Sequence, residues 1–236
     1  MTGPVFTILL LLSVAADAEE QFVKGNDLYL SGAFEAALEC YREGLSGKCN
    51  AGRFHYNSGN CLFRIGRYGE ARYHYLAALE YLPRDDRVRH NIGVVSQRLD
   101  LEFQAFPGQR RFATAEEVST AALLLLSPAF LSFALLCLTR RAWLARLGTA
   151  LFLAGMVAAG ASIVLQGVRL FSPDAGVAVT PAEVRSEPSD QVGELLFSLS
   201  EGESASIVDE RGGWIRIEDE KDRRGWVRSG PVWPLP

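Results

Sequence analysis

The chain has 236 residues, enough for one large domain or two small ones. Its formal net charge is −4 and it has no polybasic tract, which excludes the electrostatic pattern typical of nucleic-acid-binding proteins. Apolar residues are concentrated at the N-terminus and between about residues 118 and 170, so the sequence does not indicate a protein that is soluble throughout.

The N-terminal segment 1–18, MTGPVFTILLLLSVAADA, has the features of an export signal. Val5 to Ala16 is an apolar run with the length of a signal h-region, and it is short for a transmembrane helix. Ala16 and Ala18 supply the small residues that precede a cleavage point, and two glutamates follow at once. We predict a signal peptide at residues 1–18, with a buried N-terminal helix as the alternative.

A motif that begins at Gly25 recurs at Gly59. This spacing, about 34 residues, is the period typical of tetratricopeptide repeats, in which pairs of antiparallel helices stack into a superhelix. Small residues let the two helices of a pair approach, and aromatic residues fill the space between them. The matching pairs are Gly25 and Gly59, Leu28 and Leu62, Gly32 and Gly66, Phe34 and Tyr68, Ala37 and Ala71, Tyr41 and Tyr75, and Leu45 and Leu79.

One further period reaches Gly93, in a segment that predicts a single helix. Such a helix would shield the apolar face of the last repeat. Residues 19–105 are therefore predicted to form an all-α domain of two repeats and a capping helix. The region resembles the tetratricopeptide-repeat family, and it departs from the family pattern at Lys24 and Arg89, where apolar residues are usual.

The resemblance implies a concave groove lined by the first helix of each repeat. Residues spaced by three, four and seven fall on one face of such a helix. A groove of aromatic rings, arginines and amides suits an extended or helical peptide, and the arginines favour an acidic one. The predicted groove consists of Phe22, Asn26, Tyr29, Arg53, Tyr56, Asn60, Phe63, Arg64, His90 and Arg98, with Leu30, Val94 and Gln97 beside them.

Some members of this family clamp a C-terminal carboxylate with two asparagines and several cations. Asn26 and Asn60 stand at matching positions here, whereas Phe22, His90 and Val94 stand where those cations would be. Two interpretations of the asparagines stay open. They bind the main chain of a ligand, or they satisfy hydrogen bonds of neighbouring helices.

Residues 118–139 and 147–168 each run for about twenty residues without a charge, the length that a helix needs to cross a membrane. The short loop between them, residues 140–146, carries three arginines and no acid. The positive-inside rule places this loop in the cytoplasm. We predict a transmembrane hairpin in a bacterial inner membrane, with both large polar regions in the periplasm, in agreement with the export signal.

Residues 177–236 are predicted to form a small all-β domain. Stretches such as ASIVDE and WIRIED alternate apolar and polar residues, and glycines and acidic turns separate them. The segments 184–186, Gly213-Trp214 and Gly225-Trp226-Val227 resemble those of bacterial SH3-like domains. The resemblance implies a small barrel, and some relatives bind cell-wall peptides. Trp214 and Trp226 are interpreted as core residues rather than ligand-binding aromatics.

No constellation of residues indicates catalysis, a metal site or a cofactor. The histidines and three of the four cysteines lie in the repeat region, without the spacing of a metal site or the signature of a Cys–His nucleophile. In an exported region, one disulfide among these three cysteines is compatible with the compartment. We predict a non-enzymatic protein without a cofactor. The residues concerned are His55, His74, His90, Cys40, Cys49 and Cys61.

The order of export signal, repeats, membrane hairpin and barrel resembles that of the E proteins of bacterial Bat (aerotolerance) operons over nearly the whole chain. This resemblance implies a multidomain inner-membrane protein that works with von Willebrand factor A-domain Bat proteins and a MoxR-type ATPase in oxygen tolerance and envelope stress. The residues alone indicate a scaffold whose groove binds a segment of a partner membrane protein. The alternative is a sensor or anchor that binds peptidoglycan through the SH3-like domain.

Overall fold

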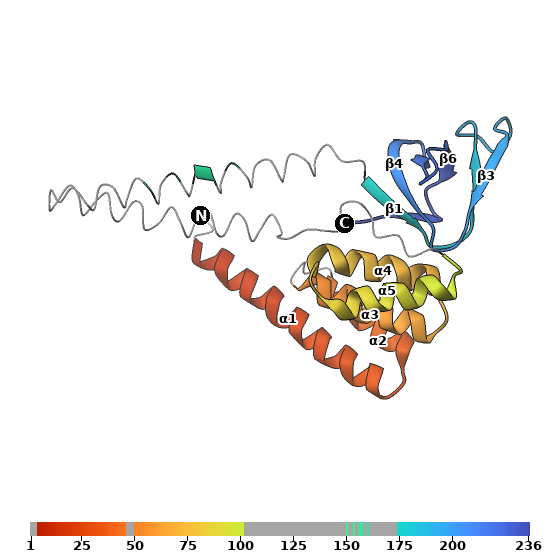
Figure 1. The fold of residues 1–236 in the computed structure, drawn as a ribbon. Coiled ribbons are helices and arrows are strands. Elements are labelled where there is room, and N and C mark those ends of the chain that lie inside the picture. Colours follow the sequence, from red (N-terminus) through yellow and green to blue (C-terminus); the bar gives the residue numbers. More distant parts are fainter. Residues whose placement is uncertain are drawn as a thin grey trace. The chain divides into compact units, whose positions relative to one another are not determined.

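The computed structural model describes residues 4–45, 50–101 and 174–236, together with residues 150, 153, 156, 157 and 160. The chain divides into two compact units. Residues 1–109 and 174–236 form the first unit, and residues 110–173 form the second. The first unit contains a helical region and a β-domain (Figure 1).

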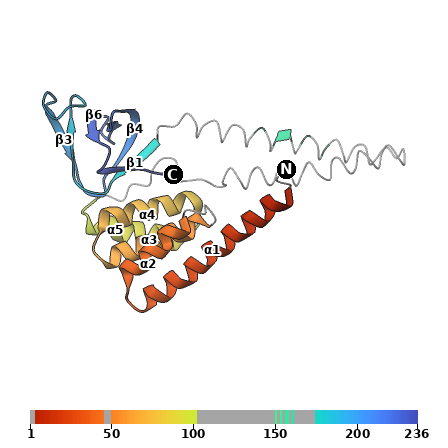
Figure 2. The same ribbon diagram turned by 180° about the vertical axis from the view of Figure 1, so that it is seen from behind.

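In the described residues, five α-helices form the helical region, and each packs against the next along the chain (Figures 1 and 2). This arrangement gives two helix pairs followed by one further helix, as the repeat period in the sequence predicts. The helices are α1 (Pro4–Leu30), α2 (Phe34–Leu45), α3 (Ala51–Arg64), α4 (Tyr68–Tyr81) and α5 (Asp86–Arg98).

The turns inside the two helix pairs have the same geometry. Gly32 and Gly66 have φ angles of +83° and +84°, in the left-handed region that glycine adopts without strain. In both turns the residue after the glycine donates its N–H to a carbonyl five residues earlier, over 2.9 Å. The repeated glycine thus ends the first helix of each pair in the same way.

Close contacts between glycine and tyrosine hold the helices of each pair together. A β-carbon at Gly25 would lie 2.5 Å from the ring of Tyr41, and one at Gly59 would lie 2.7 Å from the ring of Tyr75. Both rings are buried, so a side chain at either glycine would displace them. The core around them includes Ala37, Leu38, Phe54, Leu62, Ala71, Leu76, Val88, Ile92 and Val95.

The first helix extends well before residue 19. It begins at Pro4 and runs without interruption to Leu30. Ala18 is buried against the core of the helical region. Residues 4–18 of the predicted signal peptide therefore share a helix with the first repeat, and cleavage after Ala18 stays a prediction.

The predicted membrane hairpin lies outside the described residues, apart from the isolated positions in its second span. Among the helices that the structure does describe, none is both long enough and apolar enough to cross a membrane. The spans at 118–139 and 147–168 and the loop at 140–146 stay predictions.

The β-domain is an antiparallel sheet with the strand order β3-β2-β6-β5-β4-β1-β7. It begins at Asp174, slightly before the predicted boundary at residue 177. The strands are β1 (Asp174–Ala178), β2 (Ala182–Arg185), β3 (Leu195–Leu199), β4 (Ser204–Arg211), β5 (Trp214–Glu218), β6 (Arg224–Arg228) and β7 (Val232–Pro234).

Turn chemistry fixes the register of the central hairpin in this sheet. Gly212 and Gly213 connect β4 to β5 with φ angles of +55° and +82°, as a two-residue turn with two positive φ angles requires. The sheet encloses its own apolar core, separate from that of the helices. This core consists of Ala178, Ala182, Val184, Leu199, Ala205, Ile215, Ile217, Val227 and Val232.

Candidate functional site: the repeat groove

The ten residues of the predicted groove lie on the three odd-numbered helices. Side-chain contacts link α1 to α3 and α3 to α5, so these positions form a continuous row. Phe22, Asn26 and Tyr29 lie on α1, Arg53, Tyr56, Asn60, Phe63 and Arg64 on α3, and His90 and Arg98 on α5.

Asn26 connects three helices. Its Oδ1 atom accepts a hydrogen bond from the Tyr41 hydroxyl over 2.8 Å and one from Asn57 Nδ2 over 3.1 Å. Tyr41 belongs to α2 and Asn57 to α3, so this single oxygen joins α1 to both neighbours.

Asn60 repeats the arrangement one period later. Its Oδ1 atom accepts from the Tyr75 hydroxyl over 2.9 Å and from Asn91 Nδ2 over 3.0 Å. Each member of this set stands one repeat period after its counterpart in the first set. The structure therefore supports the second interpretation of the asparagines, because their side-chain oxygens satisfy neighbouring helices.

Arginines stack on aromatic rings of the row, again with the repeat period. The Arg53 guanidinium lies 4.0 Å from the ring centre of Phe22, and that of Arg87 lies 5.6 Å from the ring centre of Tyr56. Such cation–π contacts contribute about 0.5–1 kcal/mol each at exposed sites. They hold positive charge over apolar surface along the row.

A second pair of aromatic contacts borders the row near its helix ends. Tyr29 meets the ring of Phe34 edge to face at 5.3 Å, and Phe63 meets that of Tyr68 at 5.4 Å. Burial raises the pKa of Tyr29, and the charge of Arg64 opposes this effect. The phenol is therefore neutral at pH 7 and available as a hydrogen-bond donor.

The cations of the row have different surroundings. Arg64 is exposed, and its guanidinium lies 5.0 Å from the ring centre of Phe34. His90 and Arg98 are also exposed, on α5. Arg53 lies 3.8 Å from the Glu19 carboxylate, so part of its charge is compensated. Arg64 and Arg98 are thus the groove cations best placed to meet a ligand, and His90 is exposed on the same helix as Arg98.

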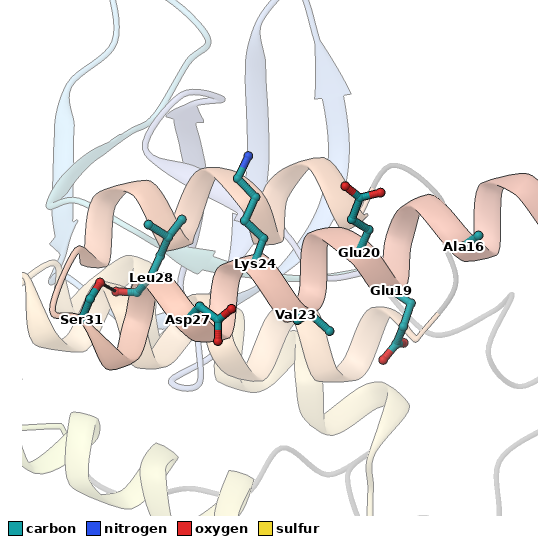
Figure 3. A pocket seen from close by; sticks show the side chains of 8 residues that line it. All are labelled: Ala16, Glu19, Glu20, Val23, Lys24, Asp27, Leu28 and Ser31. Atoms are coloured by element: carbon teal, nitrogen blue, oxygen red, sulfur yellow. Dashed lines mark hydrogen bonds between the residues drawn. The ribbon is translucent and has the colours of Figure 1, made fainter.

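A hollow of about 840 Å³ lies along α1, outside the predicted groove (Figure 3). Its described lining residues come from α1 and from Ser31 directly after it, and Glu19, Glu20, Lys24 and Asp27 give it a mixed charge. A surface with one described wall lacks the convergent polar groups that a ligand site needs. The hollow is therefore not a second candidate site.

Two histidines outside the row meet between α3 and α4. The Nδ1 atoms of His55 and His74 lie 3.0 Å apart, and both side chains are buried. Burial lowers the pKa of His55 to about 4, and burial together with the neighbouring His55 lowers the pKa of His74 well below its usual value. At neutral pH one neutral ring donates to the other, and the pair packs between α3 and α4.

The described cysteines are also packing residues. Cys40 and Cys61 are buried free thiols, so the two do not form a disulfide with each other, and Cys49 lies outside the described residues. Burial raises the pKa of Cys61 to about 12, so the nucleophilic thiolate does not form at pH 7. Across the part of the chain that the structure describes, no three His, Cys, Asp or Glu side chains gather as a metal site would require.

The tryptophans of the β-domain, Trp214 and Trp226, are buried hydrophobic residues, as predicted. They alternate with the core residues Ile215 and Val227 and so lie on the opposite face of the sheet. Arginines cover their rings there: Arg228 lies 5.1 Å from the ring centre of Trp214, and Arg211 lies 5.7 Å from that of Trp226. Each ring therefore has an arginine guanidinium over it on this face of the sheet.

Sequence reasoning did not identify three residues that complete the row. Asn57, Asn91 and Arg87 contact Asn26, Asn60 and Tyr56, respectively. The repeat period was the available signal, because Asn57 matches Asn91 and Arg53 matches Arg87. The meeting of His55 with His74 had no such signal, since neither residue recurs one period away.

Comparison with known families gives two matches. Residues 52–85 match the model of the tetratricopeptide repeat, and residues 180–231 match that of the bacterial SH3 domain. The first match spans most of α3 and all of α4, and the second covers the sheet from β2 to β6. A search of curated proteins gives no match. The chain therefore combines a tetratricopeptide repeat, a module typical of protein–protein interaction, with a bacterial SH3 domain, and both kinds of domain are typically non-catalytic.

Proposed function

We propose that this protein is a non-enzymatic, membrane-anchored scaffold whose repeat groove binds a segment of a partner membrane protein in the periplasm. The observation that carries the proposal is the row of cations and aromatic rings on α1, α3 and α5. Apolar rings give a bound peptide contact area, and guanidinium groups give it charged hydrogen-bond donors. A segment that contains acidic and apolar residues suits this row best.

The proposed location follows from the export signal and the two hydrophobic spans in the sequence. The resemblance to the E proteins of Bat operons suggests the partner class. On this proposal the partner is a membrane protein with a von Willebrand factor A domain, and the complex acts in oxygen tolerance or envelope stress.

Co-purification from crosslinked membranes tests the scaffold function. Arg64→Glu reverses the charge of an exposed arginine of the row, whereas Arg42→Glu reverses that of an exposed arginine on α2, outside the row. We expect Arg64→Glu to lose a specific partner that the wild type and Arg42→Glu retain. An identical set of partners in all three samples would contradict binding in the groove.

A second candidate function is binding of peptidoglycan through the β-domain. The match of residues 180–231 to the bacterial SH3 domain favours it. Arg216 lies on the outer face of the sheet between Trp226 and Asp209, where it could meet carboxylates of cell-wall peptides. Sedimentation of the full chain with purified peptidoglycan tests this function, and Arg216→Glu should then reduce the bound fraction.

A further inference from the structure

A buried arginine joins the helical region to the β-domain within the first unit. Arg72 of α4 is 4% exposed. Its Nη1 atom donates to the Gly202 carbonyl and, over 2.7 Å, to Ser204 Oγ, while its Nε donates to Ser96 Oγ over 3.3 Å. Burial lowers the pKa of Arg72 to about 10, so the group is charged at pH 7. A buried charge is tolerated when its hydrogen bonds are satisfied, and here the β-domain supplies two of the three acceptors.

Gly202 lies close to Leu99, the residue that follows α5, in a left-handed backbone conformation that favours glycine. A β-carbon at Gly202 would lie 2.4 Å from Leu99 Cδ1, and the residue has a φ of +81°. Next to it, the Glu201 carboxylate accepts the backbone N–H of Gly69 over 2.6 Å, in the first turn of α4. A negative charge is favourable at this end of a helix.

Apolar contacts extend the same interface. Val177 of β1 is fully buried and belongs to the core of the helical region, and Leu235 packs against that core. The rings of Tyr73 and Trp233 meet edge to face, with their centres 5.1 Å apart. Val177, Trp233 and Leu235 lie outside residues 180–231, so these contacts are additions to the matched SH3 domain.

The repeat period allows Arg72 to be compared with the matching residue of the first repeat. Arg72 stands one period after Leu38, which is buried inside the helical stack. In a longer array, the second helix of a third repeat would continue the stack beside α4 and α5. Here the loop at 201–204 contacts α4 and Leu99, the residue directly after α5. At the position of the buried Leu38, the second repeat has the cation Arg72. The neighbouring groups there are the Gly202 carbonyl and the Ser204 hydroxyl.

We propose that the β-domain is a built-in cap of the repeat array, docked on α4 and on the residue that follows α5, and that Arg72 is the residue that specifies this docking. The cap leaves the predicted groove accessible, because Arg64, His90 and Arg98 are exposed while it is in place. The repeats and the β-domain then move as one body, and a partner bound in the groove is held at a fixed position relative to the β-domain.

Hydrogen exchange of the full-length protein in detergent, read by mass spectrometry, tests the cap. Arg72→Leu restores the residue type of Leu38 but leaves Ser204 and the Gly202 carbonyl without their donor. We expect amides at the interface, including that of Gly69, to exchange on the order of 10- to 100-fold faster, as the loss of charged hydrogen bonds predicts. Amides of α2 and of the β5–β6 pair should be unchanged, because each domain retains its own core.

Arg42→Leu is the matched control, since Arg42 is an exposed arginine of α2 that pairs with Glu39. It should leave exchange at the interface unaltered. If Arg72→Leu fails to fold, Ser204→Ala, which removes one acceptor and keeps the arginine, should give a smaller increase at the same amides. Equal exchange at the interface in the wild type and in the folded variant would overturn the proposal.

Discussion

Tyr75 donates its hydroxyl hydrogen to Asn60 Oδ1 over 2.9 Å, and the same bond joins Tyr41 to Asn26 one repeat earlier. Replacing Asn60 by alanine would leave the donors of Tyr75 and Asn91 without this acceptor. We expect Asn60→Ala to lower the free energy of unfolding by about 1–3 kcal/mol. Thermal unfolding of the full chain followed by circular dichroism measures this change. Gln97→Ala, on the exposed side of α5, should have almost no effect, and equal losses for the two variants would count against the network.

Two helical glycines offer a matched test of close packing. Gly59→Ala puts a β-carbon 2.7 Å from the Tyr75 ring, so we expect a loss of about 1–3 kcal/mol in the free energy of unfolding. A β-carbon at Gly93 would have no atom within 4 Å apart from its chain neighbours and its own helix backbone. Gly93→Ala should therefore stabilise the chain by up to about 1 kcal/mol through helix propensity. The sign of the change in melting temperature separates the two variants. The same sign for both would refute the packing argument.

The buried histidines predict a loss of stability in mild acid. Native His55 stays neutral down to a pKa of about 4, whereas a histidine of the unfolded chain takes up a proton near 6.5. The unfolded state therefore holds more protons between these values, and stability decreases as the pH falls through this window. Each such histidine contributes a slope of up to about 1.4 kcal/mol per pH unit.

Urea unfolding at pH 7, 6 and 5 measures the slope. His55→Gln should make it shallower, because one of the two buried rings no longer titrates. Gln97→Ala changes an exposed side chain that does not titrate and should leave the slope as in the wild type. A wild-type slope in the His55 variant would show that other groups cause the acid sensitivity.

Asp219 organises the turn between β5 and β6. Its Oδ1 atom accepts the backbone N–H groups of Lys221 and Arg223, each over 2.9 Å, and its Oδ2 atom accepts from Arg223 Nε over 2.7 Å. Because the carboxylate is 6% exposed, Asp219→Ala should cost about 2 kcal/mol or more in unfolding free energy. Asp209→Ala breaks a more exposed pair with Arg211 and should cost less than about 1 kcal/mol. Differential scanning calorimetry of both variants compares them, and similar melting temperatures would contradict the assigned role of Asp219.

The sequence was most informative where the physics is local or periodic. The spacing of Gly25 and Gly59 predicts both the helix pairs and the tyrosine contacts. A small residue that recurs with an aromatic residue indicates two helices that pack closely, with the ring against the glycine. The paired glycines 212 and 213 likewise indicate the β4–β5 hairpin, since positive φ angles at both turn positions favour glycine.

Contacts between distant segments could not be predicted in this way. Arg72 looks like a surface residue of a helix, and nothing in its surroundings along the chain indicates acceptors at Gly202 and Ser204. Asn26 and Asn60 were placed on the first helix of each repeat, but their hydrogen-bond partners depend on where neighbouring helices lie. Alternation placed Trp214 and Trp226 on strands, but their contacts with Arg228 and Arg211 depend on how the strands pair.

The contact between Arg72 and Ser204 also sets an order of assembly. The two residues are separated by 132 positions, so during synthesis the helices emerge long before their acceptors. Contacts between such distant residues carry a high cost of chain closure and form late. Until the last strands are made, Arg72 of α4 lacks its two acceptors in the β-domain, and the ring of Tyr73 lacks its contact with Trp233. In a newly made chain, the surface around Arg72 and Tyr73 is therefore exposed, and it is buried only when the C-terminal strands have folded onto it.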